Sequence, residues 1–171
     1  MRTMVRQPVA GSNPAVKSKR PPKRPSEYAL QIRELRKIRD AYHLRKKQLS
    51  VYARLLRKSK EVAALLPLLE LRLENVVYRS GAVTTRRAAR QKIRHAAVKV
   101  NGRIVTIPSL ALKVGDKLLI SKVQFSEETA VPMWLRLHRT KNEVLVVRTP
   151  EATEVEPDID ETLILEYYSK R

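Results

Sequence analysis

Apolar residues recur every three to four positions in two stretches between residues 26 and 66. This spacing predicts two amphipathic helices, each with one apolar face and one strongly basic face. Ser26 followed by Glu27 favours a helix start, because a serine caps free N–H groups and an acid suits the positive end of the helix dipole. The apolar positions are Tyr28, Ile32, Leu35 and Ile38 in the first stretch and Leu44, Leu49, Tyr52 and Leu55 in the second.

A third helical pattern begins near Pro67, a residue that suits a first helical turn because its missing N–H has no partner there. It directs Leu69, Leu73, Val76 and Val77 inward, and Gly81 is expected to end it. Thr84 or Thr85 should cap the next helix. The inner face of that helix is a stripe of mostly small residues, which allows close packing: Ala88, Ala89, Ile93 and Ala96.

The apolar period then changes from 3.6 to 2, which indicates strands. The stretches VKV and RIVTI flank Asn101-Gly102, a strong hairpin signal, and KLLIS follows a turn at Gly115-Asp116. EVLVVR and TLILEYY are further strand candidates, separated by the acidic loop PEATEVEPDID. The expected fold is therefore α+β: an N-terminal helical region, then a helix pair with β-hairpins and a small, mostly antiparallel sheet.

Four segments follow from this pattern. Residues 1–25 should be a basic arm, residues 26–66 a helical basic region, and residues 67–125 a module of one helix pair and hairpins. Residues 126–171 should add strands and the acidic loop to the domain that carries the module. The arm holds five prolines and seven positive charges, so we expect it to be disordered alone and ordered by RNA, a solvated tail being the alternative.

The charge balance indicates a polyanionic partner. The chain has 171 residues, with 36 Lys and Arg against 17 Asp and Glu, a net charge of +19. Nucleic acid is the first expectation, and an anionic membrane surface the second. Residues 1–60 carry +15 and residues 61–125 carry +8, whereas residues 126–171 carry −4. The last third should therefore face something other than the polyanion.

Several other classes are disfavoured. The longest apolar runs are far shorter than the roughly 18 residues of a membrane helix. The N-terminus has no continuous apolar stretch of a secretory signal, and the prolines of KSKRPPKRPS oppose an organellar transit helix. Cysteine is absent, and the three histidines (43, 95 and 138) lack metal-ligand spacing. No glycine-rich phosphate loop or catalytic triad is evident, so we expect no enzyme, metal or cofactor.

Folded RNA is the favoured polyanion. Arg86, Arg90 and Arg94 recur at i, i+4 and i+8, and such a row of guanidiniums over a rigid apolar helix can match recurring phosphates. Eight aromatic residues exist, few of them in basic runs, which disfavours single-strand binding by stacking. Tyr78 and Trp134 are expected in the core. The acids Asp158, Asp160 and Glu161 are interpreted as a solvated loop or a face for a basic protein, not a cation site.

Several motifs of the chain resemble those of a known family. LLELRLENVVYRSG, TTRRAARQ, VNGRIVTIPS and KVGDKL resemble the RNA-binding module of bacterial-type ribosomal small-subunit protein four. RPSEYALQIRELRKIRDAY, VPMWL and DIDETLILEYYSKR resemble the segments that flank this module in the family. The resemblance covers roughly residues 23–171.

The resemblance implies a structural constituent of the small ribosomal subunit that binds 16S-type ribosomal RNA early, nucleates assembly of the subunit body and supports translational accuracy. It implies contacts with small-subunit proteins three and five, proximity to the path of incoming messenger RNA, and a cytoplasmic ribosome, an organellar one being the alternative. The N-terminal region is shorter than usual and lacks the cysteines of the zinc cluster. Ala96 stands where the family often has glycine, at a cost of about 1 kcal/mol if the backbone there has positive φ.

The candidate RNA contacts lie in the module and in the helix before it. For Asn101 a pure turn role is an equal alternative. The competing functions are a free RNA-binding accessory factor with the same module and an RNA-modifying enzyme, for which the chain after the module leaves no room. The candidates are Arg72, Arg79, Thr85, Arg86, Arg90, Gln91, His95, Lys99, Asn101 and Arg103 in the module, and Arg33, Arg36, Lys37 and Arg39 before it.

Overall fold

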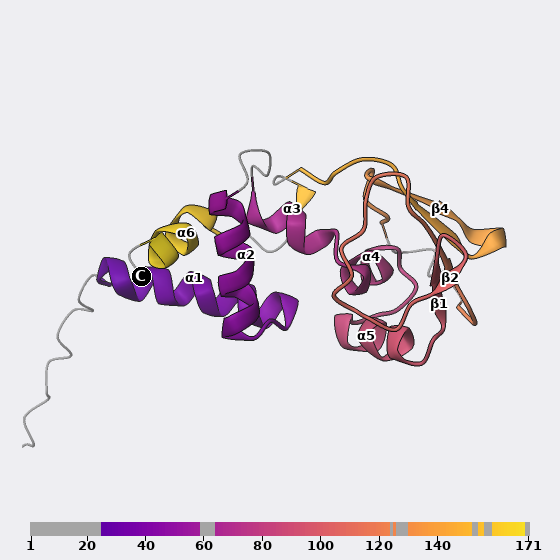
Figure 1. The fold of residues 1–171 in the computed structure, drawn as a ribbon, viewed down its shortest axis with the longest axis horizontal. Helices are drawn as coiled ribbons and strands as arrows, with labels where there is room; N and C mark the ends of the chain where they lie inside the picture. The colour runs from indigo at the N-terminus through magenta and orange to yellow at the C-terminus, as the bar shows by residue number, and fades with distance from the viewer. Residues whose placement is uncertain are drawn as a thin grey trace, which may run out of the picture.

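The computed structural model describes residues 25–58, 64–123, 125, 130–151, 154–155 and 159–169. They form two lobes, one of helices and one built on a sheet (Figure 1). The predicted arm, apart from its last residue, and residues 152, 153 and 156–158 of the acidic loop lie outside the described residues. Among the described residues, no helix is both long and apolar enough to cross a membrane.

The helical lobe contains four helices around its own apolar core. As predicted, Ser26 begins the first of them: its Oγ accepts a hydrogen bond from the Ala29 N–H at 3.3 Å. That helix ends at His43, whose φ is 51°. The helices are α1 (Glu27–Tyr42), α2 (Lys46–Lys58), α3 (Leu65–Glu70) and α6 (Glu161–Ser169).

The strand predicted in TLILEYY is wrong, because these residues form α6. This helix packs against α1 and α2, so the C-terminal segment completes the helical lobe instead of the sheet (Figure 1). Ile164 and Tyr167, three residues apart, are buried in the helical core. The β-branched and aromatic residues of this segment favour a strand, but packing overrides that preference. A helix places Ile164 and Tyr167 on one face, and this face packs into the apolar core shared with α1 and α2.

The acids before α6 have structural roles. Asp160 Oδ1 accepts hydrogen bonds from the backbone N–H groups of Thr162 (2.9 Å) and Leu163 (3.4 Å). Glu161 accepts from the N–H groups of Leu65 (2.6 Å) and Leu66 (3.0 Å), the start of a helix that has no side-chain cap of its own. The interpretation of Glu161 as a solvated loop residue is therefore wrong.

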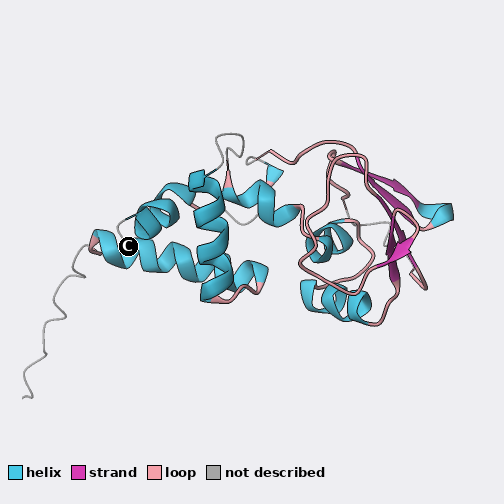
Figure 2. Ribbon diagram, in the orientation of Figure 1, coloured by secondary structure: helices cyan, strands magenta, loops and turns pink. Residues whose placement is uncertain are grey.

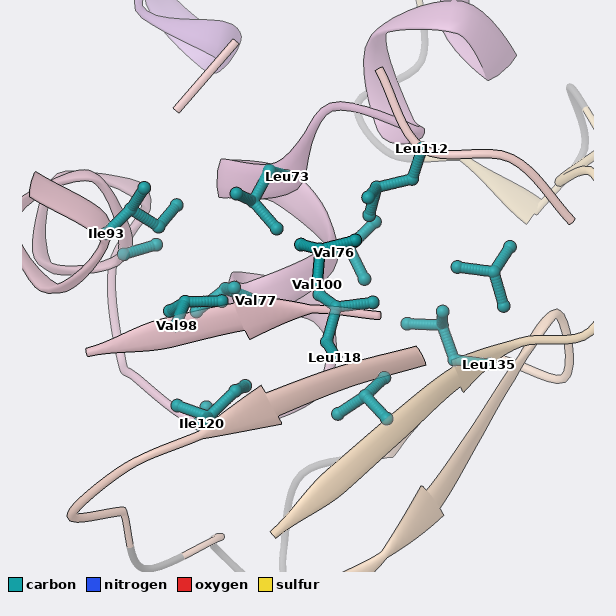
Figure 3. Close-up of a cluster of buried hydrophobic side chains, with 14 of the residues drawn as sticks. Leu73, Val76, Val77, Ile93, Val98, Val100, Leu112, Leu118, Ile120 and Leu135 are labelled. Atoms are coloured by element: carbon teal, nitrogen blue, oxygen red, sulfur yellow. The ribbon is translucent and has the colours of Figure 1, made fainter. Parts of the chain in front are cut away.

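The sheet lobe has five antiparallel strands in the order β2-β1-β3-β5-β4. Helices α4 and α5 lie against one face, and the side chains between them and the sheet form the core of this lobe (Figures 2 and 3). Trp134 is buried in this core, and the partly buried Tyr78 packs against the core, as predicted. The elements are α4 (Leu73–Arg79), α5 (Arg86–Arg94), β1 (Val98–Val100), β2 (Arg103–Ile104), β3 (Lys117–Ile120), β4 (Leu135–His138), the 3₁₀ turn η1 (Arg139–Lys141) and β5 (Glu143–Val146).

The single helix predicted from Pro67 to Gly81 is two helices, α3 and α4. The backbone is extended at Arg72, and the Leu73 N–H donates to the Leu110 carbonyl at 2.8 Å. This break has a packing reason: Leu69 lies in the core of the helical lobe, whereas Leu73 lies in the core of the sheet lobe. One straight helix could not direct its apolar residues into both cores.

The predicted turns are present. Asn101 (φ 48°) and Gly102 (φ 81°) form the tip between β1 and β2, in the left-handed conformation that such hairpin turns require. Thr85 caps α5, its Oγ1 accepting from the Ala88 N–H at 3.1 Å. After α5, Ala96 has a φ of 56°, so the positive φ on which its predicted cost depends is present.

Candidate nucleic-acid interface

Two buried glutamates lie where the lobes meet. Glu70 is the last residue of α3 and Glu74 lies in the first turn of α4, and each is 1% exposed. A buried carboxylate is stable only when hydrogen-bond donors and positive charge compensate for lost hydration. Arginines from α4, α5 and the break between α3 and α4 supply both.

Glu74 binds two arginines. Its Oε1 accepts from Arg72 Nε at 3.1 Å and Nη2 at 2.8 Å, and its Oε2 accepts from Arg90 Nε at 2.7 Å. The hydrogen bond to Glu74 raises the pKa of Arg90 above its ordinary value, so this guanidinium stays charged. Arg72 also donates to the Tyr52 hydroxyl at 2.6 Å, which links the break to α2.

Glu70 binds two more arginines and a tyrosine. It accepts from Arg79 Nε at 3.1 Å and Nη2 at 3.0 Å, and Arg86 Nη2 lies 3.5 Å from its Oε1. The Tyr42 hydroxyl donates to the same oxygen at 2.9 Å. Burial, together with the negative charge of Glu70, raises the pKa of Tyr42 far above its ordinary value. The phenol therefore remains a donor at every physiological pH.

Arg86 connects the two lobes directly. Its guanidinium lies 4.9 Å from the ring centre of Tyr42 in α1 and 4.6 Å from that of Tyr78 in α4. Its Nε donates to Asn75 Oδ1 at 3.0 Å, and Asn75 Nδ2 donates to the Leu69 carbonyl at 2.6 Å. Cation–π contacts and hydrogen bonds of this kind restrain both the side chain and the orientation of the lobes.

The four candidate arginines that contact the buried glutamates therefore differ in how deeply they are buried. Arg72 is 3% exposed and its guanidinium donates inward to Glu74 and Tyr52, so its contact with RNA stays a prediction that its burial disfavours. Side-chain exposure is 16% for both Arg79 and Arg86 and 31% for Arg90. These three reach the surface with part of the guanidinium while the remainder is fixed from below.

The more exposed candidates of the sheet lobe lie on α5, in the turn after it and on the first hairpin. Gln91, His95 and Arg103 are exposed, and Lys99 is half-buried on β1. Thr85 is exposed, but its hydroxyl caps α5. Asn101 donates to Asp116 Oδ1 at 2.8 Å and accepts from the Lys117 N–H at 2.9 Å, which favours the turn role for this residue.

Arg87 and Arg94 were not among the candidate contacts, although Arg94 belongs to the predicted arginine row. Both are exposed, and neither makes an ion pair or a side-chain hydrogen bond with the described residues. Their signal was available in the sequence: with Gln91 they follow i, i+4 and i+7 on the face of α5 opposite the buried Ala89 and Ile93.

The remaining candidates lie on α1, in the helical lobe. Arg33, Arg36 and Arg39 are exposed, whereas Lys37 is partly buried and its Nζ lies 2.7 Å from Glu34 Oε1. Within the described part of the chain, no group of three or more His, Cys, Asp or Glu side chains could hold a metal ion.

Fold and site together define a class of protein. A helix pair with a hairpin sheet behind it, and arginines along the second helix, is an S4 RNA-binding domain, and the S4 domain family matches residues 71–118. Curated relatives extend the similarity to most of the chain. Small ribosomal subunit protein uS4 of Verminephrobacter eiseniae is 39% identical over 160 residues, which cover 86% of this chain and 77% of the relative.

Other relatives agree with this match. Small ribosomal subunit protein uS4B of Psychromonas ingrahamii is 40% identical over 172 residues, covering 92% of this chain and 82% of the relative. The uS4 protein of Chromobacterium violaceum is 38% identical over 158 residues, covering 85% and 77%. The chain belongs to the small ribosomal subunit protein uS4 family.

Proposed function

We propose that this chain is a structural constituent of the small ribosomal subunit that binds ribosomal RNA through its S4 domain. Membership of the uS4 family supports this role. The structural observation that supports it most is that the acids of this region are buried whereas cations reach its surface. Glu70 and Glu74 are buried, and residues 75–115 contain nine Lys and Arg and no acid. The partner would therefore meet a surface of cations with the compensating acids beneath it.

The buried acids would also prepare the surface for binding. Arg79, Arg86 and Arg90 are each fixed by a carboxylate, so they lose less side-chain entropy when a phosphate arrives than free arginines would. The exposed Arg87, Arg94 and Arg103 would add long-range attraction. Cations on a rigid support suit recognition of folded RNA by shape and phosphate contacts.

The finer role follows from the family resemblance. It comprises early binding of the RNA, nucleation of the subunit body, support of translational accuracy, and contacts with small-subunit proteins three and five and with incoming messenger RNA. We further propose a cytoplasmic ribosome and no catalytic activity. A free accessory factor with the same domain is the competing function.

The direct test is RNA binding as a function of salt. Arg87→Gln combined with Arg94→Gln removes two exposed cations without touching the Glu70 and Glu74 contacts. For a small-subunit ribosomal RNA fragment, we expect the log–log salt slope to become shallower by about 1.5, since each phosphate contact contributes roughly 0.7 to 0.9. Filter binding at several salt concentrations measures this slope.

Arg136→Gln combined with Arg139→Gln is the matched control, because it removes the same charge from exposed positions on β4 and η1. An equal change of slope in both double variants would contradict the proposed interface. Sucrose-gradient sedimentation then separates the two roles. A constituent stays in the small subunit through a high-salt wash at one copy per particle, whereas a chain that washes off is an accessory factor.

A further inference from the structure

The two lobes have separate apolar cores. Leu69 lies in the core of the helical lobe and Leu73 in that of the sheet lobe, and among the described residues the two clusters of buried side chains share no member. The lobes lie side by side and are connected near α3 and α4 (Figure 1). Units of this kind move relative to one another unless a large apolar interface joins them. The orientation of the lobes therefore depends on polar and aromatic contacts between them.

The backbone provides a pivot at the C-terminal end of α3. From Leu71 onward the chain is bonded to the sheet lobe: the Leu71 carbonyl accepts from the Leu112 N–H at 2.8 Å, and Arg72 forms an antiparallel bridge with Ala111. Glu70, by contrast, is the last residue of α3 and belongs to the helical lobe. A rotation of one lobe against the other would therefore be absorbed between Glu70 and Leu71.

One group of side chains spans this pivot. Arg86 in α5 contacts the ring of Tyr42 and the carboxylate of Glu70 in the helical lobe. On its own side it contacts the ring of Tyr78 and donates to Asn75. A cation–π contact is stronger when water is excluded from it, and Tyr42 and Glu70 are each 1% exposed. We name these five residues the interlobe joint.

We propose that Tyr42 is a positioning residue for RNA binding: through Arg86 it fixes the orientation of the lobes, and it does so without touching the RNA. This inference rests on the proposed function. Tyr42 belongs to α1, outside residues 71–118 that match the S4 domain family. Its 1% exposure prevents contact with a ligand, whereas the side chain of Arg86 is 16% exposed and reaches the surface. The helical lobe thus acts on the S4 domain through a buried contact.

Spin labels measure the orientation of the lobes, because the chain has no cysteine and two can be introduced. Arg54→Cys on α2 and Arg136→Cys on β4 are exposed positions in different lobes. Double electron–electron resonance should give one narrow distance distribution for the labelled chain without further substitution. Tyr42→Leu and Arg86→Gln should each broaden this distribution. Arg90→Gln is the matched control on α5: it removes a contact within the sheet lobe and should leave the distribution narrow.

Affinity for the small-subunit ribosomal RNA fragment is the second measurement. Tyr42→Leu should weaken binding about tenfold, the effect of one partly desolvated cation–π contact. The salt slope should not change, because no cation is removed. Tyr42→Phe keeps the ring and should restore both the affinity and the narrow distance distribution. Tyr42→Leu added to Arg86→Gln should cause no further loss, because two residues that act through one contact are not additive.

Far-ultraviolet circular dichroism and the emission of the buried Trp134 verify that both lobes are folded in each variant. If Tyr42→Leu does not fold, Arg86→Gln tests the same joint from the other lobe. An unchanged distance distribution in Arg86→Gln would overturn the proposal, as would an unchanged RNA affinity in a folded Tyr42→Leu variant.

The double variant separates positioning from a general loss of stability. Additive losses of affinity in Tyr42→Leu with Arg86→Gln would assign Tyr42 a structural role alone and would also overturn the proposal. The salt slope of Arg87→Gln with Arg94→Gln tests the proposed function independently of the joint. An unchanged slope there contradicts RNA binding by this face, whereas the results above contradict only the positioning role.

Discussion

Glu74→Gln tests whether the buried charges stabilise the sheet lobe. The substitution keeps the size of the side chain but removes its charge, while Arg72 remains 3% exposed. Removing one partner of a buried ion pair costs about 3–5 kcal/mol, because the other charge stays buried and unpaired. The glutamine oxygen can still accept one hydrogen bond from Arg72, and water can reach Arg90. We therefore expect a loss near the lower limit, about 3 kcal/mol.

Trp134 provides the assay, because it is the single tryptophan of the chain and is buried in the core of the same lobe. Its fluorescence follows urea unfolding of the sheet lobe. With an m value of about 2 kcal/mol per molar urea, the midpoint should fall by about 1.5 M. Glu151→Gln is the matched control, since the side chain of Glu151 is 72% exposed and its ion pair with Arg148 is long, at 3.7 Å.

A second variant tests the cause of the loss. Arg72→Met combined with Glu74→Gln removes both charges, and should be more stable than Glu74→Gln alone, since a buried pair can often be replaced by apolar groups without loss. A midpoint for Glu74→Gln equal to that of Glu151→Gln would refute the buried-charge reasoning. A double variant no more stable than the single one would show that the energy has another source.

Three further changes address backbone and capping features of the sheet lobe. Ala96→Gly should raise the free energy of unfolding by about 1 kcal/mol, because φ at this position is 56° and glycine adopts that value without strain. Asn101→Ala should lower it by about 2 kcal/mol, through the loss of two hydrogen bonds and the strain of alanine at positive φ. Thr85→Ala should lower it by about 1 kcal/mol by removing the cap of α5, whereas Thr85→Ser should retain most of it.

Urea unfolding followed by Trp134 fluorescence measures these three changes as well. A destabilised Ala96→Gly variant would show that the methyl group contributes packing that outweighs the strain. An Asn101→Ala variant as stable as the unmodified chain would mean that the hairpin forms without the side-chain contacts. For Thr85, equal losses in the Ala and Ser variants would exclude the hydroxyl as the stabilising group.

Local signals in the sequence were reliable where the cause was also local. Ser26 and Thr85 cap helices through N–H groups three residues away, and Asn101-Gly102 forms the predicted turn through its positive φ values. The resemblance to a family that often has glycine at the position of Ala96 likewise pointed to its φ, which is positive. Such features need little tertiary information.

Features that depend on contacts with residues far away in the sequence were not predictable from local patterns. The break between α3 and α4 depends on two cores formed by other segments, and α6 depends on the faces of α1 and α2. Arg72 resembled the other arginines in sequence, and only the fold shows that it is buried against Glu74 and Tyr52. The ring contact of Tyr28 with Tyr167 joins residues 139 positions apart, which no local pattern reveals.

By itself, the sequence determined the class of fold, the basic character of the chain and the polyanionic partner, because these depend on composition, period and short-range backbone preferences. Only the tertiary structure decided which cations face solvent and which compensate buried acids. The reason is physical: the exposure of a charge depends on what packs around it, and those neighbours come from parts of the chain that periodicity along one helix does not include.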